Sequence, residues 1–283
     1  MPAAISAFPL SPPSYKQGFA RHAGESVYPV LWRGLIGLWS PELGPTGTVL
    51  YDHSGNQNDG TISVTTLSAT WRPWREGQTW CLHMPVTTDV VTIPAADILN
   101  IKGAVTVLCR LNPNGSFGTG ARLVEKELNT SYALMYAAAS QSLRFGMDSN
   151  SDNANTVEAT NAIAQQAWSS VVGTWDEVTL RLYVNGRELA NQGWVNTVTG
   201  DTGDLTFFKD QDSTANSING LLGQVAIWDR ALTPVEIRLL SARPMALLQL
   251  RRQARRTIVP IAAGGRFPLV NYEHLLVGGG LVA

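Results

Sequence analysis

The chain has 283 residues, of which 44% are hydrophobic and 15% are charged, and its formal net charge is −1 at pH 7. A chain of this length can bury a sizeable core, and β-sandwiches of about 200 residues or more often form one domain. No run approaches the ~18 consecutive apolar residues of a membrane-spanning helix, so the composition excludes a helical membrane protein. The 26 glycines and 9 tryptophans suit a sheet protein with many turns.

Residues 1–30 contain five prolines: Pro2, Pro9, Pro12, Pro13 and Pro29. Proline fixes φ and removes a hydrogen-bond donor, so this segment is predicted to be an extended arm rather than a helix or a central strand. Its sequence also lacks the basic start and continuous apolar stretch of a secretory signal. We therefore expect a protein made in the cytoplasm of a host cell without export through a signal peptide.

Short segments with strand character then follow one another, separated by turn residues. The predicted strands are 34–39, 47–51, 60–64, 79–84, 89–93, 104–111, 121–125, 132–137, 142–147, 155–160, 168–175, 178–184, 204–208 and 221–228. Thr233, Pro234 and Glu236 form a capping box with proline at the first helical position, which predicts one short helix over 233–242. Core positions are expected for Trp39, Trp168, Trp175 and Trp228.

The stretch 168–189, WSSVVGTWDEVTLRLYVNGREL, is the most informative part of the chain. Apolar and polar residues alternate in two runs, which is typical of strands with one face on a core. The second run ends at Asn185-Gly186, a dipeptide that readily adopts the positive φ values of a tight hairpin turn. The stretch therefore predicts an antiparallel hairpin in a β-sandwich.

This stretch resembles the signature of the laminin-G-like, concanavalin A-like lectin and glucanase jellyroll family. Three more segments resemble that family in the same order: GLIGLW at 34–39, DHSGNQNDGT at 52–61 and GLLGQVAIWDRALT at 220–233. The resemblance covers roughly residues 33–242. It implies an all-β, antiparallel two-sheet jellyroll sandwich, which we assign to residues 31–242, between an N-terminal arm (1–30) and a basic C-terminal arm (243–283).

The 52–59 loop is a candidate calcium site. Asp52, Ser54, Asn56, Asn58 and Asp59 gather oxygen-bearing side chains in eight residues, and Ca²⁺ prefers oxygen ligands. The family resemblance implies ligand roles for Asp52 and Asn56, and Asp59 is the third candidate. The alternative is that these side chains cap the loop through Asx turns. Calcium is therefore expected as a cofactor if these side chains bind a metal ion, and no other cofactor is expected.

Trp71, Trp74 and Arg75 are candidate ligand-binding residues. They lie in WRPWR at 71–75, which we expect to be a loop with exposed aromatic and cationic groups, and Trp194 is a further loop candidate. Aromatic rings beside polar groups suit carbohydrate, and tryptophan and arginine also dominate protein–protein contacts. The sequence does not decide whether these residues bind a carbohydrate or a protein.

Catalytic patterns are not evident in the sequence. Glycoside hydrolysis needs two carboxylates that flank the scissile bond, and the nearest arrangement is Glu125-Lys126-Glu127 at an ordinary strand end. The four histidines stand apart, with no nucleophile elbow beside them. The two cysteines are Cys81 and Cys109, and Cys109 lies in a predicted buried strand, which favours a reduced core thiol. A disulfide between the two stays open as the alternative. We expect a protein that is not an enzyme.

The C-terminal segment has the opposite charge from the rest of the chain. Residues 1–242 hold 15 Lys and Arg against 21 Asp and Glu (−6), whereas residues 243–283 hold 6 against 1 (+5). Four arginines lie close together in that segment: Arg251, Arg252, Arg255 and Arg256. No aromatic residue is interleaved with them, so docking onto an acidic protein surface is favoured over nucleic acid. That surface could belong to another copy of the chain, which predicts a homo-oligomer.

Two functions follow from these features. The preferred hypothesis is a structural or decoration protein of a phage-type virion, with the jellyroll displayed outward and both arms locking onto neighbouring capsid subunits. The alternative is a carbohydrate-binding, lectin-like module, assisted by calcium, that recognises a cell-surface glycan. The fold by itself does not decide between them.

Overall fold

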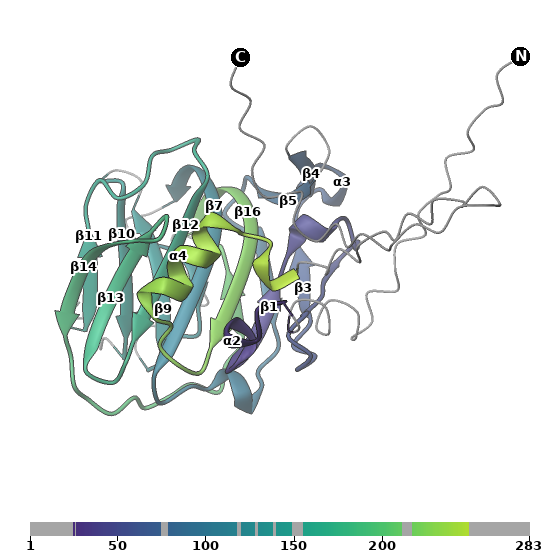
Figure 1. Ribbon diagram of the computed structural model, residues 1–283. Coiled ribbons are helices and arrows are strands. Elements are labelled where there is room, and N and C mark those ends of the chain that lie inside the picture. The colour runs from purple at the N-terminus through teal and green to yellow at the C-terminus, as the bar shows by residue number, and fades with distance from the viewer. Residues whose placement is uncertain are drawn as a thin grey trace, which may run out of the picture. The chain divides into compact units, whose positions relative to one another are not determined.

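The computed structural model describes Glu25 and residues 27–74, 79–117, 120–127, 130–137, 140–148, 155–210 and 217–248. In this part of the chain two antiparallel sheets of eight strands each form a sandwich (Figure 1). The predicted all-β fold is therefore confirmed. Among the described residues, no helix is long and apolar enough to cross a lipid bilayer.

Sheet A has the strand order β14-β13-β12-β7-β16-β5-β4, and β1 also pairs with β16. Its strands are β14 (Arg187–Gly193), β13 (Thr179–Val184), β12 (Ser169–Trp175), β7 (Val105–Phe117), β16 (Ser217–Trp228), β5 (Thr79–Met84), β4 (Trp71–Trp74) and β1 (Leu35–Trp39).

Sheet B has the order β11-β10-β9-β8-β15-β6-β3-β2. Its strands are β11 (Thr156–Ala159), β10 (Ser142–Met147), β9 (Tyr132–Ala137), β8 (Ala121–Glu125), β15 (Leu205–Phe207), β6 (Val90–Ile93), β3 (Gly60–Ser63) and β2 (Val49–Leu50). All the predicted strands are present, with ends that shift by a few residues.

The main core lies between the two sheets. In most strands of sheet B, apolar residues that point toward sheet A alternate with polar residues that point away from it. In β6, Val91 and Ile93 are fully buried in this core, and Thr92 points to the outer face. Gly173 in β12 is required for the packing of the sheets, since a Cβ atom there would lie 2.3 Å from the ring of Phe145 in β10. Trp39 and Trp175 complete this core.

The β12–β13 pair is antiparallel as predicted, and the turn after β13 has the predicted conformation. Asn185 and Gly186 both have positive φ, 49° and 82°. This is the left-handed backbone that a two-residue hairpin turn requires. The turn leads into β14, an exposed edge strand that we did not predict because its sequence, RELANQG, has no apolar alternation.

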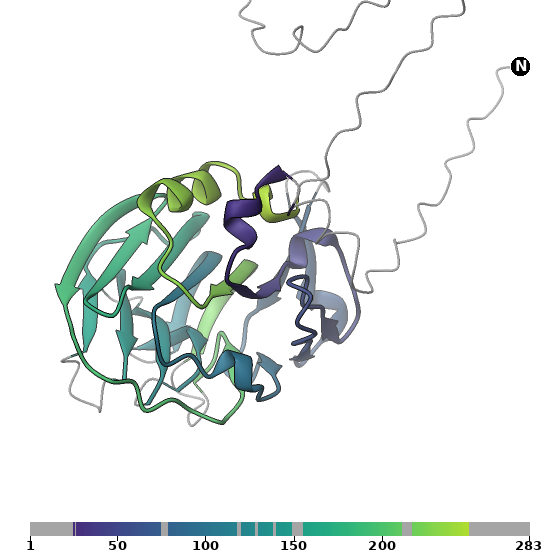
Figure 2. The ribbon, with the colours of Figure 1, turned by 60° about the horizontal axis from the view of Figure 1, so that its bottom comes forward.

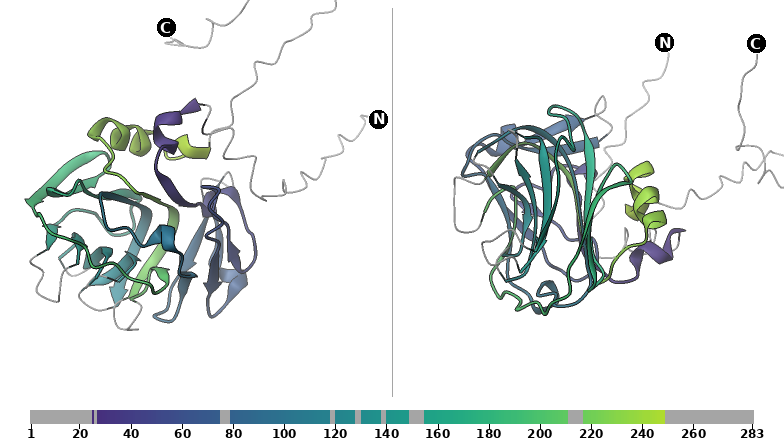
Figure 3. Two further views of the ribbon diagram at one scale, coloured as in Figure 1. Left: turned by 90° about the horizontal axis from the view of Figure 1, so that it is seen from below. Right: turned by 90° about the vertical axis from the view of Figure 1, so that its left-hand side faces the viewer.

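A second apolar cluster covers the outer face of sheet A. Three short helices lie over it: α2 (Pro29–Trp32), α4 (Pro234–Ala242) and the 3₁₀ helix η3 (Ala246–Leu248). Figures 2 and 3 show α2 and α4 on the same side of the sandwich. The Nε1 atom of Trp228 in β16 donates a 2.7 Å hydrogen bond to the carbonyl of Leu31, which ties α2 to the sheet.

The predicted helix at 233–242 is confirmed, with its capping box. The Thr233 hydroxyl accepts from the amide of Glu236, and the Glu236 carboxylate accepts from the amide of Thr233. The remaining short helices are α3 (Leu67–Thr70), η1 (Pro41–Leu43) and η2 (Asp97–Leu99).

Four local predictions are wrong. Pro29 and Val30 begin a helix instead of ending an extended arm, because Leu31 and Trp32 gain burial against sheet A. Residues 71–74 form strand β4, and Trp194 is buried against Trp175 with ring centroids 4.8 Å apart. Trp168 is half-buried, on the outer face of sheet A, with the Arg110 guanidinium 4.8 Å from the centre of its ring.

The predicted division at residues 30 and 242 stays a prediction. Residues 246–248 lie beyond the second boundary and pack against α2 and α4 in the outer cluster of sheet A. Residues 1–24 and 249–283, which make up most of both predicted arms, lie outside the described residues.

Candidate ligand-binding face

The outer face of sheet B is polar, whereas the helices cover much of the outer face of sheet A. The alternation that buries Val91 and Phe207 in the core places Thr92 and Thr206 on this outer face. Charged side chains extend the polar surface along the neighbouring strands: Arg122 and Glu125 on β8, Arg144 on β10 and Glu158 on β11. Such fixed polar groups can orient a ligand.

Arg122 organises the centre of this face. Its Nε atom lies 2.6 Å from Oε1 of Glu125, and its Nη2 atom lies 3.5 Å from Oδ2 of Asp210. The Nη1 atom donates to the carbonyl of Gly120 at 2.8 Å and contacts the sulfur of Met135 at 2.9 Å. The side chains of Arg122 and Glu125 are 14% and 2% exposed. Charged groups that are this deeply buried must be paired, so these ion pairs are part of the folded structure of sheet B.

A β-bulge places Arg122 and Glu125 on the same face. Strict alternation would put residues three apart on opposite faces of a strand. The register of β8 against β9 shifts between Arg122 and Val124, so Leu123 and Val124 both point into the core. The bulge thereby returns Glu125 to the outer face beside Arg122.

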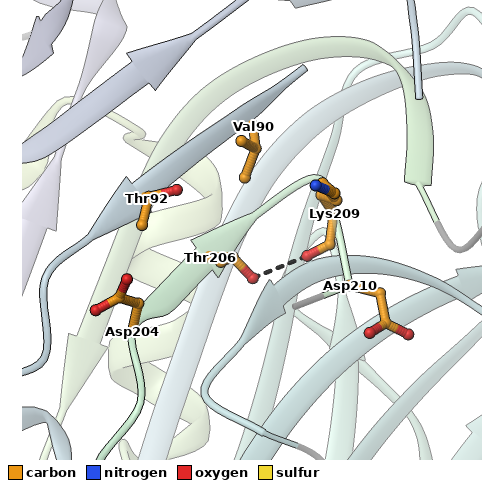
Figure 4. Close-up of a pocket in the computed structure, with 6 residues that line it drawn as sticks. All are labelled: Val90, Thr92, Asp204, Thr206, Lys209 and Asp210. Carbon is orange, nitrogen blue, oxygen red and sulfur yellow. Dashed lines mark hydrogen bonds between the residues drawn. The ribbon is translucent and has the colours of Figure 1, made fainter. Parts of the chain in front are cut away.

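A hollow of about 210 Å³ lies next to this network. Its lining comes from β6, β15 and the residues around β15: Val90, Thr92, Asp204, Thr206, Lys209 and Asp210 (Figure 4). The Thr206 hydroxyl donates a 2.8 Å hydrogen bond to the Lys209 carbonyl, which fixes the chain at the rim.

The rim has an unusual backbone at Phe208, whose φ is 68°. A bulky residue with positive φ is an outlier that the surrounding structure must hold in place. Phe207 and Phe208 are consecutive and both fully buried, which normal strand alternation forbids. The left-handed turn at Phe208 allows this packing and directs the chain so that Lys209 and Asp210 line the hollow.

Asp204 is fixed at the opposite side of the hollow from Asp210 in the view of Figure 4. Its Oδ1 atom accepts a 2.9 Å hydrogen bond from the amide of Ala95. The Lys126 side chain lies beneath residues 201–204, which precede β15, and is 1% exposed. Its ammonium group donates to the carbonyl of Gly203 and lies 3.7 Å from Asp201. Burial lowers the pKa of Lys126, and the charges of Asp201 and Asp204 oppose that shift.

The predicted calcium loop lies between β2 and β3 of sheet B, and an isolated β-bridge pairs Asp52 with Trp39 of β1. Both carboxylate oxygens of Asp52 accept two hydrogen bonds each. The donors are the amides of Leu38, Ser54 and Asn58 and the Ser54 hydroxyl, at 2.8–3.1 Å. Burial raises the pKa of Asp52, and these hydrogen bonds oppose the shift. The arrangement is that of a buried loop cap.

The other two candidate ligands also take part in that loop. Asn56 donates from Nδ2 to the carbonyl of Ile36 at 3.0 Å, and Asp59 accepts from the amide of Asp52 at 2.8 Å. Among the described residues, no three His, Cys, Asp or Glu side chains come together as a metal site would require. Calcium binding by Asp52, Asn56 and Asp59 stays a prediction.

The predicted aromatic ligand site does not form an exposed loop. Trp71 packs partly buried against the main core, and its Nε1 atom donates a 3.0 Å hydrogen bond to the carbonyl of Gly47. Arg75 and the side chain of Trp74 lie outside the described residues, as do Arg251, Arg252, Arg255 and Arg256. Their ligand-binding and partner-binding roles stay predictions.

The sequence singled out Glu125 but missed the hollow. Glu125 was considered as one of two catalytic carboxylates, whereas it forms an ion pair with Arg122. Arg122, Asp204, Lys209 and Asp210 carried no motif. Period-two alternation in β6 and β15 was the one signal that could have placed Thr92 and Thr206 on this face.

The protein-family model of the concanavalin A-like lectin/glucanases superfamily matches residues 86–238. A comparison with curated protein sequences finds no match. Similar solved structures include the binding domain of Paraclostridial Mosquitocidal Protein 1 (TM-score 0.55, 14% identity). They also include a structure of botulinum neurotoxin type C, whose cell entry depends on interaction with two ganglioside molecules (TM-score 0.55, 16% identity).

These two matches cover 74% and 76% of this chain. In turn, this chain spans about half, 52%, of the length of each of the two matched structures. Domain 4 of AbnA, a GH43 extracellular arabinanase from Geobacillus stearothermophilus, in complex with arabinotriose, is matched over 98% of its length and 73% of this chain. That match has a TM-score of 0.53 and 16% identity. At these identities the likeness shows the fold. With a family match over more than half of its residues, this chain belongs to the concanavalin A-like lectin/glucanase superfamily.

Proposed function

We propose that this protein is a lectin-like, carbohydrate-binding module that binds saccharide on the outer face of sheet B. The observation that carries this proposal is the hollow beside the Arg122 network. Saccharides present many hydroxyl groups, which donate to carboxylates and exchange hydrogen bonds with threonine hydroxyls. The hollow offers both kinds of group on rigid strands or on a rim fixed by hydrogen bonds.

The similar structures support binding as the function. They include the binding domain of a mosquitocidal protein, a botulinum neurotoxin that interacts with gangliosides and an arabinanase domain in complex with arabinotriose. The ligand of this chain would therefore be a glycan, on a cell surface or in a polysaccharide.

A binding role fits the geometry better than hydrolysis does. Glycoside hydrolysis needs one carboxylic acid that holds a proton for the leaving group. Glu125 instead pairs with Arg122 at 2.6 Å, and a neighbouring cation favours the ionised carboxylate. We therefore propose that the module binds its saccharide without cleaving it.

The virion hypothesis depends on the two arms, and these lie mostly outside the described residues. None of the three similar structures named above is a phage or capsid protein. A role as a virion decoration protein, with arms that lock onto capsid subunits, stays a prediction.

A glycan array with the full chain tests the proposal, followed by calorimetric titration of the best saccharide. Thr92→Tyr should fill the hollow and abolish binding, because Thr92 lies in its lining. Glu188→Ala on the exposed edge strand β14 is the matched control and should bind normally. Absence of any bound glycan, or normal binding by Thr92→Tyr at unchanged thermal stability, would reject the proposal.

A further inference from the structure

We infer that the hollow selects a neutral saccharide and rejects one that carries a carboxylate or sulfate group. This inference rests on the proposed function and adds the chemical class of its ligand. Three observations support it: the charges of the residues that line the hollow, the contacts that fix its two carboxylates, and the net charge of residues 1–242.

The lining carries a net negative charge. Asp204 and Asp210 contribute two carboxylates, and Lys209 contributes one ammonium group. The remaining lining residues are neutral: Val90, Thr92 and Thr206. An anionic sugar would bring its charge against two carboxylates in a partly desolvated site, and an unfavourable charge contact is an effective way to reject a ligand.

The two carboxylates are held in place before any ligand arrives. The amide of Ala95 fixes Asp204 at 2.9 Å, and the guanidinium of Arg122 anchors Asp210 at 3.5 Å. A held carboxylate can accept from two sugar hydroxyls, and hydrogen bonds to a charged acceptor are stronger than neutral ones. Because the acceptors are already fixed, a neutral saccharide binds without a large ordering cost in the protein.

The other nearby cations are engaged in the protein. Arg122 contacts Glu125, Asp210 and the Gly120 carbonyl, so its donors are directed at groups of the protein. Lys126 is buried under the loop and donates to the carbonyl of Gly203. Among the described residues that line the hollow, Lys209 is thus the single cation that could meet a sugar carboxylate.

The net charge of residues 1–242 acts in the same direction, and the basic segment 243–283 brings the net charge of the full chain to −1. Residues 1–242 carry a net charge of −6, from 15 Lys and Arg against 21 Asp and Glu. A negative surface lowers the local concentration of anionic ligands and slows their association, most strongly at low ionic strength.

Matched pairs of saccharides provide the test. Lactose is compared with 3′-sialyllactose, and dextran is compared with dextran sulfate, by titration into the full chain at low and physiological salt. We expect the neutral member of any bound pair to bind at least about 10-fold more tightly, because the acidic member makes an unfavourable charge contact with the two carboxylates. Asp204→Asn should reduce the preference for the neutral saccharide, and Glu188→Ala on the edge strand β14, outside the hollow, should leave both affinities unchanged.

The outcomes separate the inference from the proposed function. Tighter binding of the acidic member, lost in Lys209→Met, would overturn the inference and leave carbohydrate binding intact. If neither member of any pair, nor any glycan on the array, were bound, the proposed function would fail and the inference with it. Thermal denaturation of each variant confirms that the fold is intact.

Discussion

Arg122 and Glu125 form a 2.6 Å ion pair on the outer face of sheet B, although they are three residues apart in one strand. Arg122→Met leaves the carboxylate of Glu125 buried without its principal cation, so we expect a loss of about 3 kcal/mol of unfolding free energy. Arg144→Met is the control, because the 2.9 Å pair of Arg144 with Glu158 is 31% and 35% exposed and should be worth less than about 1 kcal/mol. Urea denaturation measures the unfolding free energy of both variants. Equal losses would contradict the conclusion that Arg122 stabilises the fold more than Arg144 does.

The bulge explains why this site could not be predicted from the sequence. Alternation assigns Arg122 and Glu125 to opposite faces, and the register shift at Val124 depends on the pairing of β8 with β9. Asp204 and Asp210 are polar residues at strand ends, like many turn residues. Their convergence depends on the pairing of β15 with β6 and β8, which no local pattern encodes.

Gly173→Ala should destabilise the sandwich by about 1–3 kcal/mol, because the added methyl group must enter space occupied by the ring of Phe145. Gly193→Ala is the matched control in β14, where nothing lies within 4 Å of an added Cβ. Chemical denaturation compares the two variants. A similar small effect for both would show that the sheets do not approach as closely as described at Gly173.

The stability should depend on pH through His53. Burial lowers the pKa of His53 from 6.5 to about 4, while the unfolded chain retains the ordinary value. The unfolded state therefore binds more protons between these values, so stability present above pH 6.5 is lost as the pH falls toward 4, by up to about 3 kcal/mol.

Urea denaturation of the wild type and of His53→Gln at pH 7 and pH 4 measures this effect. The variant should lose less stability than the wild type across the interval, because other titrating groups are common to both. An identical loss in the two proteins would show that His53 does not contribute.

Asp52→Asn should destabilise the protein by about 2 kcal/mol, because an amide group would face N–H donors with donors of its own. The four hydrogen bonds to Asp52 already use both of its oxygens. If Asp52 only caps the loop, neither calcium nor a chelator will change the melting temperature. A rise with calcium that disappears in Asp52→Asn would instead establish Asp52, Asn56 and Asp59 as ligands.

Most of the fold could be predicted because its strands carry strong local signals. The alternation in β12 and β13 and the Asn185-Gly186 turn specify a hairpin without help from distant residues. The segments that were misassigned lack such signals. Strand β4 contains Pro73 and gains its structure by pairing with β5, and α2 exists because Leu31 and Trp32 bury against sheet A.

The most direct measurement is the footprint of a bound saccharide in backbone amide chemical shifts of the labelled full chain. With the best glycan from the array at saturation, the largest shifts should fall on Thr92, Asp204, Thr206, Lys209 and Asp210. Shifts centred on Trp71 and strand β4, with the residues of the hollow unchanged, would contradict a binding site on the outer face of sheet B.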